Sequence, residues 1–428
     1  MKPKGKIFAH IDWLVLVLYG SLVIFGWLNI HAVSYQQGLH QSAFDLSRSA
    51  GKQFLWAITC VPLFGLTLFF ETKFYQSLAY VLYGLSLCLL LGTLVLGVNI
   101  SGHSAWFQWQ GVQLQPAEFA KLTCALAIAK YLDDSKALLT RLKPQLISLS
   151  IVLLPVGLII LQGDLGSCLV FGAFVLVLYR EGLPPWLILL GLFAIAVIVL
   201  TLLIPRPYLL TGMLSLALAI IGASQKTTKR LLLILLVTLS TVTLSESFRW
   251  FVGNVLKPHQ QNRIKALVDP QADPLGIGWN VTQSKIAIGS GGIWGKGYLQ
   301  GTQTKYGFVP EQSTDFIFCT IGEEHGWAGA LLVISIFWVL MARVLYLAER
   351  QRLRFTRAYG YGVASILFLH FMINVGMTIG LMPVIGIPLP FISYGGSSLW
   401  AFSLMLFILL KFDADRKNHL VGRSVSRR

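Results

Sequence analysis

Residues 13–30, WLVLVLYGSLVIFGWLNI, form an apolar run without a single charged side chain. A helix of this length rises about 27 Å, close to the ~30 Å hydrocarbon core of a membrane. The run is too long for the core of a signal peptide and has no small-residue cleavage pattern, so we expect a retained first span. This stretch predicts a helical membrane protein.

Similar apolar runs recur along all 428 residues. The chain is 55% hydrophobic and only 12% charged, with a mean hydropathy of +0.69, which does not suit a soluble globular protein. We therefore expect an all-α polytopic bundle of about twelve spans, forming one domain over residues 1–428. The expected spans lie near residues 12–31, 53–71, 74–97, 116–133, 145–163, 165–180, 185–204, 208–223, 231–249, 315–346, 358–382 and 397–411. The span at 315–346 is too long for one straight crossing and should tilt or extend beyond the membrane.

The net charge of +16 comes from basic residues in short loops and tails between the spans. This is the positive-inside pattern, and it argues against nucleic-acid binding. Both chain ends, including the tail 412–428, are then cytoplasmic, and the segment 250–314 lies outside. Loops as long as 250–314 are usually functional or disordered. This one mixes Trp, Tyr, Ile and Val with Gly and Lys, so we expect an ordered lid or re-entrant element rather than a flexible linker. The five Cys show no CxxC spacing and are expected to be reduced, buried thiols.

Asp315 lies where a polar loop becomes a hydrophobic helix, in residues 308–324, FVPEQSTDFIFCTIGEE. The chain has only 18 Asp and Glu. An ionised carboxylate at the rim of a membrane bundle is unfavourable unless it meets water or a partner, so its first interpretation is a functional site. The alternative is a helix N-cap formed by Thr314 or Asp315.

Other acidic residues also have structural interpretations beside the functional ones. Asp164 follows a glycine between two apolar runs and could cap the returning helix. Glu118 and Lys121 are three residues apart at a helix start, which favours an ion pair, although a buried Lys121 could instead hold a phosphate. Glu323 and Glu324 could form a structural polar network or take part in catalysis.

Basic residues also gather in and beside the long outer segment, against the positive-inside trend. Such a cluster suggests an anionic ligand, with anionic lipid headgroups as the alternative partner. The glycine-rich run 289–297, GSGGIWGKG, could cradle a phosphate, but it lacks the spacing of a nucleotide-binding loop, so a close-packed turn is the alternative. No His, Cys and carboxylate cluster has metal-site spacing. The outer cations are Arg249, Lys257, Arg263, Lys265, Lys285, Lys296 and Lys305.

Several motifs together resemble the SEDS proteins (shape, elongation, division, sporulation), which include RodA, FtsW and SpoVE. The resemblance spans about residues 10–411. The sequence of residues 283–292 is closer to the RodA branch than to the FtsW branch. The chain departs from the family at Ala105, usually Arg, at Gly307, a Glu in several members, and by two spans beyond the usual ten, placed between Asp164 and the long loop. The motifs are QPAEFAK (115–121), QGDLG (162–166), KPHQQNRI (257–264), QSKIAIGSGG (283–292), PEQSTDFIF (310–318) and PVIGIPLPFISYGGSS (383–398).

The resemblance implies a peptidoglycan glycosyltransferase of the bacterial cytoplasmic membrane. Such an enzyme polymerises glycan strands from lipid II on the outer face, in cell elongation and rod-shape maintenance, with an FtsW-like division polymerase or a lipid II flippase as alternatives. The essential Asp of the family maps onto Asp315, as a general base, while cations stabilise the departing diphosphate. A class B penicillin-binding transpeptidase and other elongation-complex membrane proteins are the implied partners, and a divalent cation is left open. The implied substrate-binding residues are Trp106, Glu118, Lys121, Asp164, Arg263, Gln283, Lys285, Glu311, Thr314 and Ser393.

Overall fold

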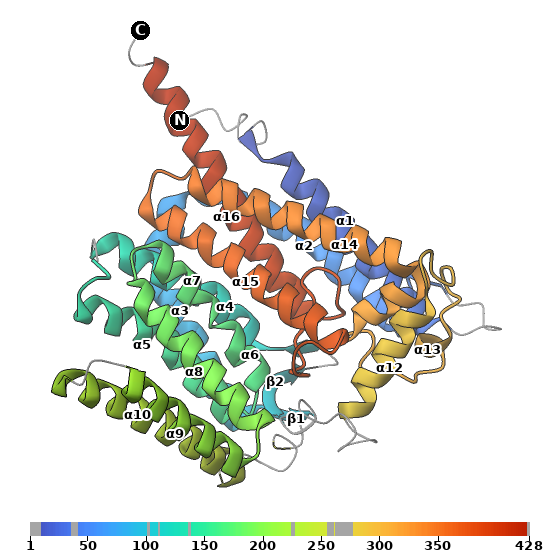
Figure 1. Ribbon diagram of the computed structural model, residues 1–428. Helices are drawn as coiled ribbons and strands as arrows, with labels where there is room; N and C mark the ends of the chain where they lie inside the picture. Colours follow the sequence, from blue (N-terminus) through green and yellow to red (C-terminus); the bar gives the residue numbers. More distant parts are fainter. Residues whose placement is uncertain are drawn as a thin grey trace. The chain divides into compact units, whose positions relative to one another are not determined.

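The structure is a computed structural model that describes residues 10–35, 42–100, 103–109, 112–135, 138–223, 227–254, 261 and 277–425. Within these ranges, ten helices are long and apolar enough to cross a membrane, and each overlaps an expected span (Figure 1). They are α1 (Trp13–Ser34), α2 (Ser49–Phe69), α3 (Thr72–Leu96), α5 (Leu142–Leu161), α8 (Pro185–Leu203), α9 (Arg206–Ala223), α10 (Thr228–Asn254), α14 (Ile317–Glu349), α15 (Arg354–Thr378) and α16 (Gly396–Val425).

The two remaining expected spans also form helices. One is α4 (Pro116–Asp134), and the other is the short pair α6 (Leu165–Val170) and α7 (Ala173–Arg180). Helix α4 carries more charge than a lipid-facing helix tolerates. It can do so because it contacts α3, α15 and α16 and buries most of its side chains among them. The all-α polytopic prediction is therefore confirmed, with ten of the twelve segments meeting the length and composition of a span.

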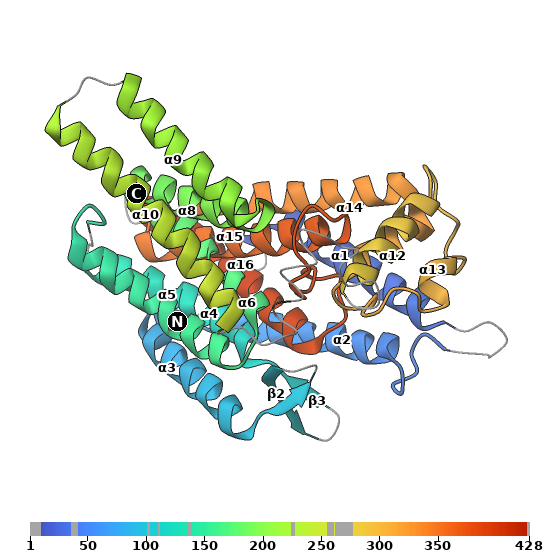
Figure 2. The same ribbon diagram turned by 60° about the horizontal axis from the view of Figure 1, so that its bottom comes forward.

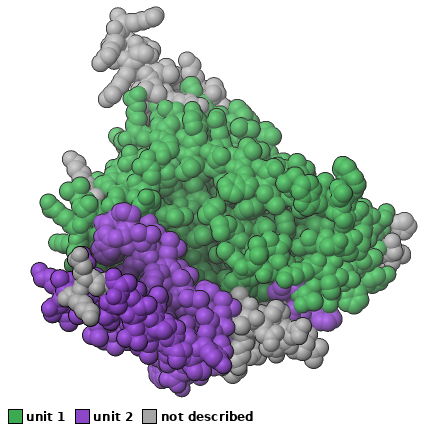
Figure 3. All heavy atoms as spheres, viewed as in Figure 1, with its two compact units in different colours: residues 1–183, 282–428 green, residues 184–281 purple. Residues whose placement is uncertain are grey.

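The chain separates into two compact units (Figure 3). Unit 1 comprises residues 1–183 and 282–428, and unit 2 comprises residues 184–281. Unit 2 holds α8, α9 and α10, which pack on one another; Thr201 donates a 3.0 Å hydrogen bond to Ser245 inside it. Most of the exposed side chains of these three helices are apolar, as expected for surfaces that face lipid. The single-domain organisation stays a prediction.

The core of unit 1 is built around α15 and α16, the two most buried of its span-length helices. Helix α14 packs along α15, α1 packs along α14, and α2 packs along α16 (Figures 1 and 2). A small antiparallel sheet joins α3 to α4 and consists of β1 (Val98–Ile100), β2 (His103–Trp109) and β3 (Val112–Leu114). In its register, Val98 pairs with Trp106 and Phe107 pairs with Leu114. These elements leave the loop between α15 and α16 at the same end of the bundle as the start of α14.

Helix α14 covers 33 residues but is interrupted at Gly326, where φ is 65° and ψ is −164°. Only glycine adopts this backbone conformation readily. The next two amides leave the helical pattern, because Trp327 N donates to Gly292 O at 2.9 Å and Ala328 N donates to Ile293 O at 3.0 Å. The structure thus accommodates the long expected span with a kink, whereas the sequence predicted only a tilt or an extension beyond the membrane.

The glycine-rich run 289–297 fills this kink. It begins with the last two residues of α12 (Ile277–Ser290) and ends before the short helix α13 (Thr302–Lys305). Lys296 N donates to Glu323 O and Gly297 N donates to Glu324 O, both at 3.0 Å. A Cβ atom at Gly291 would lie only 2.0 Å from Gly322 O. The run is therefore a close-packed turn against α14. The backbone amides of Lys296 and Gly297 are bonded to α14 and are not available to bind a phosphate.

Candidate active site

A tight turn places Asp315 immediately before α14. Glu311 has φ 54°, and its carbonyl oxygen accepts hydrogen bonds from the backbone N of Thr314 at 3.2 Å and of Asp315 and Phe316 at 3.1 Å. The N-cap position of α14 is Phe316, which makes no side-chain capping bond. The Thr314 hydroxyl instead donates to Glu311 Oε2 at 3.1 Å. Neither Thr314 nor Asp315 therefore occupies the N-cap position that the structural alternative required.

The loop between α15 and α16, residues 379–395, lies against this turn. Ser393 Oγ donates to Thr314 O and accepts from Leu389 N, and Tyr394 N donates to Ser313 O at 2.9 Å. Gly386 has φ 74°, and a Cβ atom there would lie 3.1 Å from Asp315 Oδ2. The half-buried Asp315 carboxylate thus lies directly against the backbone of the loop. The structure brings together Glu311, Thr314, Asp315 and Ser393, four of the residues that the sequence singled out.

Glu118 and Lys121 form a buried ion pair, with Nζ 2.8 Å from Glu118 Oε1. The i,i+3 pair that the sequence favoured is therefore confirmed. Lys121 Nζ also lies 2.8 Å from His370 Nε2 and 5.3 Å from the centroid of the Phe402 ring. The Lys121 side chain is fully enclosed by protein. Because this geometry gives no support to a contact between Lys121 and a phosphate, that contact stays a prediction.

Asp164 caps α6, as its structural alternative predicted. Its carboxylate accepts from Ser167 N at 3.0 Å, from Ser167 Oγ at 2.7 Å and from Gln115 Nε2 at 3.1 Å. The last bond joins two of the sequence motifs, 115–121 and 162–166. Trp106 is half-buried on β2, in the sheet that Ser104 N ties to Gln162 O at 3.1 Å.

Four of the seven outer cations lie in the described residues. Lys257, Arg263 and Lys265 lie outside the described residues. Arg249 in unit 2 donates to Ile204 O at 3.0 Å, and Lys296 pairs with the buried Glu323 at 2.7 Å. Glu323 also accepts from the backbone N of Thr302, Gln303 and Thr304, so its structural interpretation is confirmed. Lys285 is exposed on α12, two residues after the buried Gln283.

Sequence reasoning missed two polar residues of α15, His370 and Asn374. Asn374 Nδ2 lies 2.8 Å from both Asp315 O and Ile387 O, and His370 Nδ1 lies 3.1 Å from Pro388 O. They are four residues apart in an apolar segment, so they share one helix face. Polar residues at that spacing in a predicted span point toward protein, and this signal could have found them.

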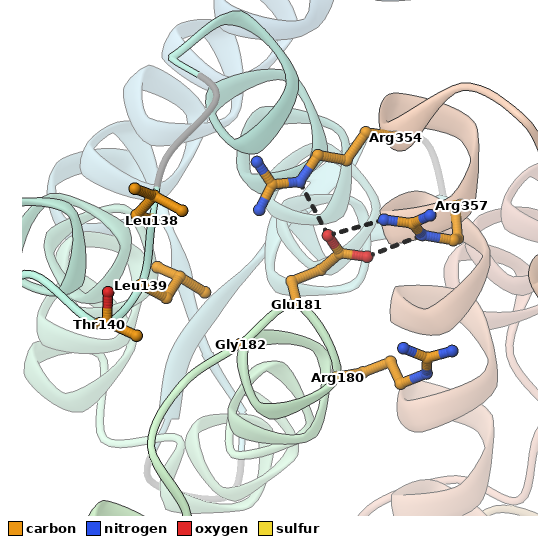
Figure 4. Close-up of a pocket in the computed structure, with 8 residues that line it drawn as sticks. All are labelled: Leu138, Leu139, Thr140, Arg180, Glu181, Gly182, Arg354 and Arg357. Atoms are coloured by element: carbon orange, nitrogen blue, oxygen red, sulfur yellow. Dashed lines mark hydrogen bonds and ion pairs between the residues drawn. The ribbon is translucent and has the colours of Figure 1, made fainter.

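A second polar cluster lies at the opposite end of α15 (Figure 4). A pocket of about 380 Å³ is lined by Glu181, Arg354, Arg357 and Arg180, among others. Glu181 accepts from Arg354 Nε at 2.8 Å and from Arg357 Nε at 3.0 Å, while Arg180 pairs with Glu349 at 2.9 Å. Burial opposes ionisation of Glu181, but the hydrogen bonds from Arg357 and Arg354 lower the pKa of its carboxyl group. The cluster joins the end of α7 to the start of α15. Arg354 lies about 30 Å from Asn374 along α15, since a helix rises 1.5 Å per residue.

None of the described residues forms a group of three or more His, Cys, Asp or Glu side chains that could hold a metal ion.

Comparison with known proteins identifies the family of this chain. A sequence model of the FtsW/RodA/SpoVE cell cycle proteins matches residues 12–212 and 192–418. The chain belongs to this family. The two matches overlap at residues 192–212, within α8 and α9. Together with the apolar helices, family membership makes the chain a multi-pass membrane protein.

Individual relatives match over nearly their whole length. The chain is 32% identical to the peptidoglycan glycosyltransferase RodA of Treponema pallidum (strain Nichols), covering 97% of this chain and 99% of the relative. It is 30% identical to the peptidoglycan glycosyltransferase MrdB of Escherichia coli (strain K12), with 99% of each chain covered. It is 29% identical to a probable peptidoglycan glycosyltransferase FtsW of Trichlorobacter lovleyi, covering 96% of this chain and 94% of the relative.

Two solved structures share the fold. One belongs to a peptidoglycan synthase complex and comes from work on how that complex coordinates polymerization and crosslinking. It has a TM-score of 0.69 at 29% identity, and the match covers 95% of this chain and 98% of that chain. The other, the rod shape determining protein RodA of Thermus thermophilus, has a TM-score of 0.60 at 26% identity and covers 95% and 97%.

Proposed function

We propose that this chain is a peptidoglycan glycosyltransferase that polymerises glycan strands from lipid II, with Asp315 as its general base. One observation carries the glycosyltransferase assignment: relatives named for that activity align with nearly the whole chain at 30% and 32% identity. The site geometry supports the role of Asp315, because its half-buried carboxylate faces a loop whose Ser393 and Tyr394 donate hydrogen bonds to the backbone of the turn that carries it.

The proposed reaction is an inverting transfer between two lipid-linked saccharides. The 4-hydroxyl oxygen of one saccharide forms a bond to the anomeric carbon of the other. The bond from that carbon to the diphosphate oxygen breaks, and undecaprenyl diphosphate leaves with its electron pair. Asp315 takes the hydroxyl proton as the new bond forms. Lys285, exposed on α12, and Arg263, outside the described residues, supply positive charge for the leaving diphosphate.

The cellular role that we propose is elongation and rod-shape maintenance. RodA and MrdB relatives reach 32% and 30% identity, against 29% for FtsW relatives, and the wording of residues 283–292 points the same way. The polymerase works in the bacterial cytoplasmic membrane, with both chain ends inside and the Asp315 face outside. Its partner is a class B penicillin-binding transpeptidase, in keeping with the similar structure that belongs to a peptidoglycan synthase complex.

Purified protein in liposomes tests this function. With lipid II already on the accessible leaflet, we expect glycan polymer that a muramidase degrades, and none from empty liposomes. Movement of lipid II between leaflets without any polymer would instead identify a flippase and contradict the proposal.

A further inference from the structure

Asn374 connects the turn that carries Asp315 to the loop that faces it. Its side chain is fully buried in α15. Both atoms near its amide group, Asp315 O and Ile387 O at 2.8 Å, are backbone carbonyl oxygens, which only accept hydrogen bonds. The amide nitrogen must therefore face them, and each of its two hydrogens reaches one carbonyl. One side chain thus fixes the backbone on both sides of the carboxylate.

His370, one turn earlier on the same face of α15, holds the next residue of the loop. A charged Lys121 ammonium group can only donate, so the His370 Nε2 that lies 2.8 Å from it is the acceptor. The remaining hydrogen is then on Nδ1, which donates to Pro388 O at 3.1 Å. Glu118 completes the chain by accepting from Lys121 at 2.8 Å. The buried ion pair therefore fixes the protonation of His370, and His370 fixes the loop.

We infer that His370 and Asn374 are positioning residues for glycosyl transfer, and that Glu118 and Lys121 act through His370. This inference rests on the proposed function of Asp315 as the base. The segment from Gly380 to Tyr394 contains no regular secondary structure, so its path against the carboxylate depends on its bonds. The buried α15 holds Ile387 and Pro388, and the bonds of Ser393 and Tyr394 to the turn hold its far end. The transfer needs the base within hydrogen-bond reach of the attacking hydroxyl, and displacements of about 1 Å can lower rates by roughly 10²-fold.

Two replacements of His370 separate the two hydrogen bonds. In His370→Asn, the amide of Asn takes the place of Nδ1, so the bond to Pro388 O can be kept while the contact with Lys121 is lost. In His370→Gln, the amide takes the place of Nε2, so Lys121 keeps its acceptor while Pro388 O loses its donor. The inference predicts that the Asn variant retains most of its kcat and that the Gln variant loses roughly 10²-fold in kcat with KM little changed. A role limited to compensating the charge of Lys121 predicts the reverse order.

Asn374→Leu provides the second measurement, because it keeps the number and branching of the heavy atoms and removes both donors. We expect a fall in kcat of similar size, with KM for lipid II unchanged within about threefold, in protein whose elution and melting curve show a folded state at the assay temperature. Equal activity of both His370 variants, or a Gln variant more active than the Asn variant, would overturn the inference. An active Asp315→Asn variant would instead contradict the proposed function, so the two failures are distinguishable.

Discussion

At the scale of single residues, the Asp315 carboxylate lies against the loop between α15 and α16, and Asn374 bonds to the backbone of both the Asp315 turn and this loop. A rare carboxylate at the start of an apolar helix is visible in the sequence, and so is the i,i+3 pair of Glu118 and Lys121. The bonds from Asn374 to Asp315 O and Ile387 O were not predictable, because they join α15 to two loops whose paths follow from tertiary packing. Residue types alone therefore identified a candidate base without the residues that hold it.

Glu181 gives a prediction for the dependence of stability on pH. Its folded pKa is lowered, so its contribution to the free energy of unfolding is present above the unfolded pKa, about 4.3, and is lost as pH falls through the folded value. We expect Glu181→Gln to reduce stability at pH 7 by about 1–3 kcal/mol, because two guanidinium groups lose their charged acceptor. Thermal unfolding of purified protein between pH 7 and pH 3 measures this, and the difference from the unsubstituted protein should hold down to about pH 4.3 and shrink below it.

The control is Glu349→Gln at the exposed pair with Arg180, where a much smaller effect is expected because both side chains are about half exposed. Equal effects of the two substitutions would contradict the structural role assigned to Glu181.

At the scale of secondary-structure elements, hydropathy predicted the positions of the helices well. All twelve expected segments form helices, including α4 and the pair α6 and α7, which are less apolar or shorter than the others. The kink in α14 was not predicted, because an apolar window is blind to the conformation of a single glycine. The glycine-rich run 289–297 was ambiguous for the same reason, since either a phosphate or the α14 backbone could use its amides.

Gly326→Ala tests the kink. A Cβ atom there would lie 2.3 Å from Gly295 N, and φ 65° with ψ −164° disfavours any side chain. We expect a loss of at least about 1–3 kcal/mol in unfolding free energy, seen as a lower melting temperature. Gly289→Ala in α12 is the matched control, because no atom lies within 4 Å of its added Cβ and alanine favours helix. An unchanged melting temperature in Gly326→Ala would show that the kink is not required.

At the scale of the whole molecule, composition and span count were sufficient for the fold class, and the motifs for the family. The separation into two units was not visible in the sequence, because α8, α9 and α10 look like ordinary spans by hydropathy. The family match that overlaps at residues 192–212 lies in these helices. Apart from Gln261, which lies in unit 2, the motif residues that the structure describes belong to unit 1, the unit with α4, α14, α15 and the Asp315 turn.

The rate of glycan synthesis by Asp315→Asn tests the central claim most directly. Asn keeps the size of the side chain but cannot accept the proton of the attacking hydroxyl. General-base assistance contributes about 10²–10⁴ in rate, so we expect a variant that melts like the unsubstituted protein yet polymerises lipid II at least about 10²-fold more slowly. A folded Asp315→Asn variant with near-normal polymerisation would contradict the assignment of Asp315 as the base.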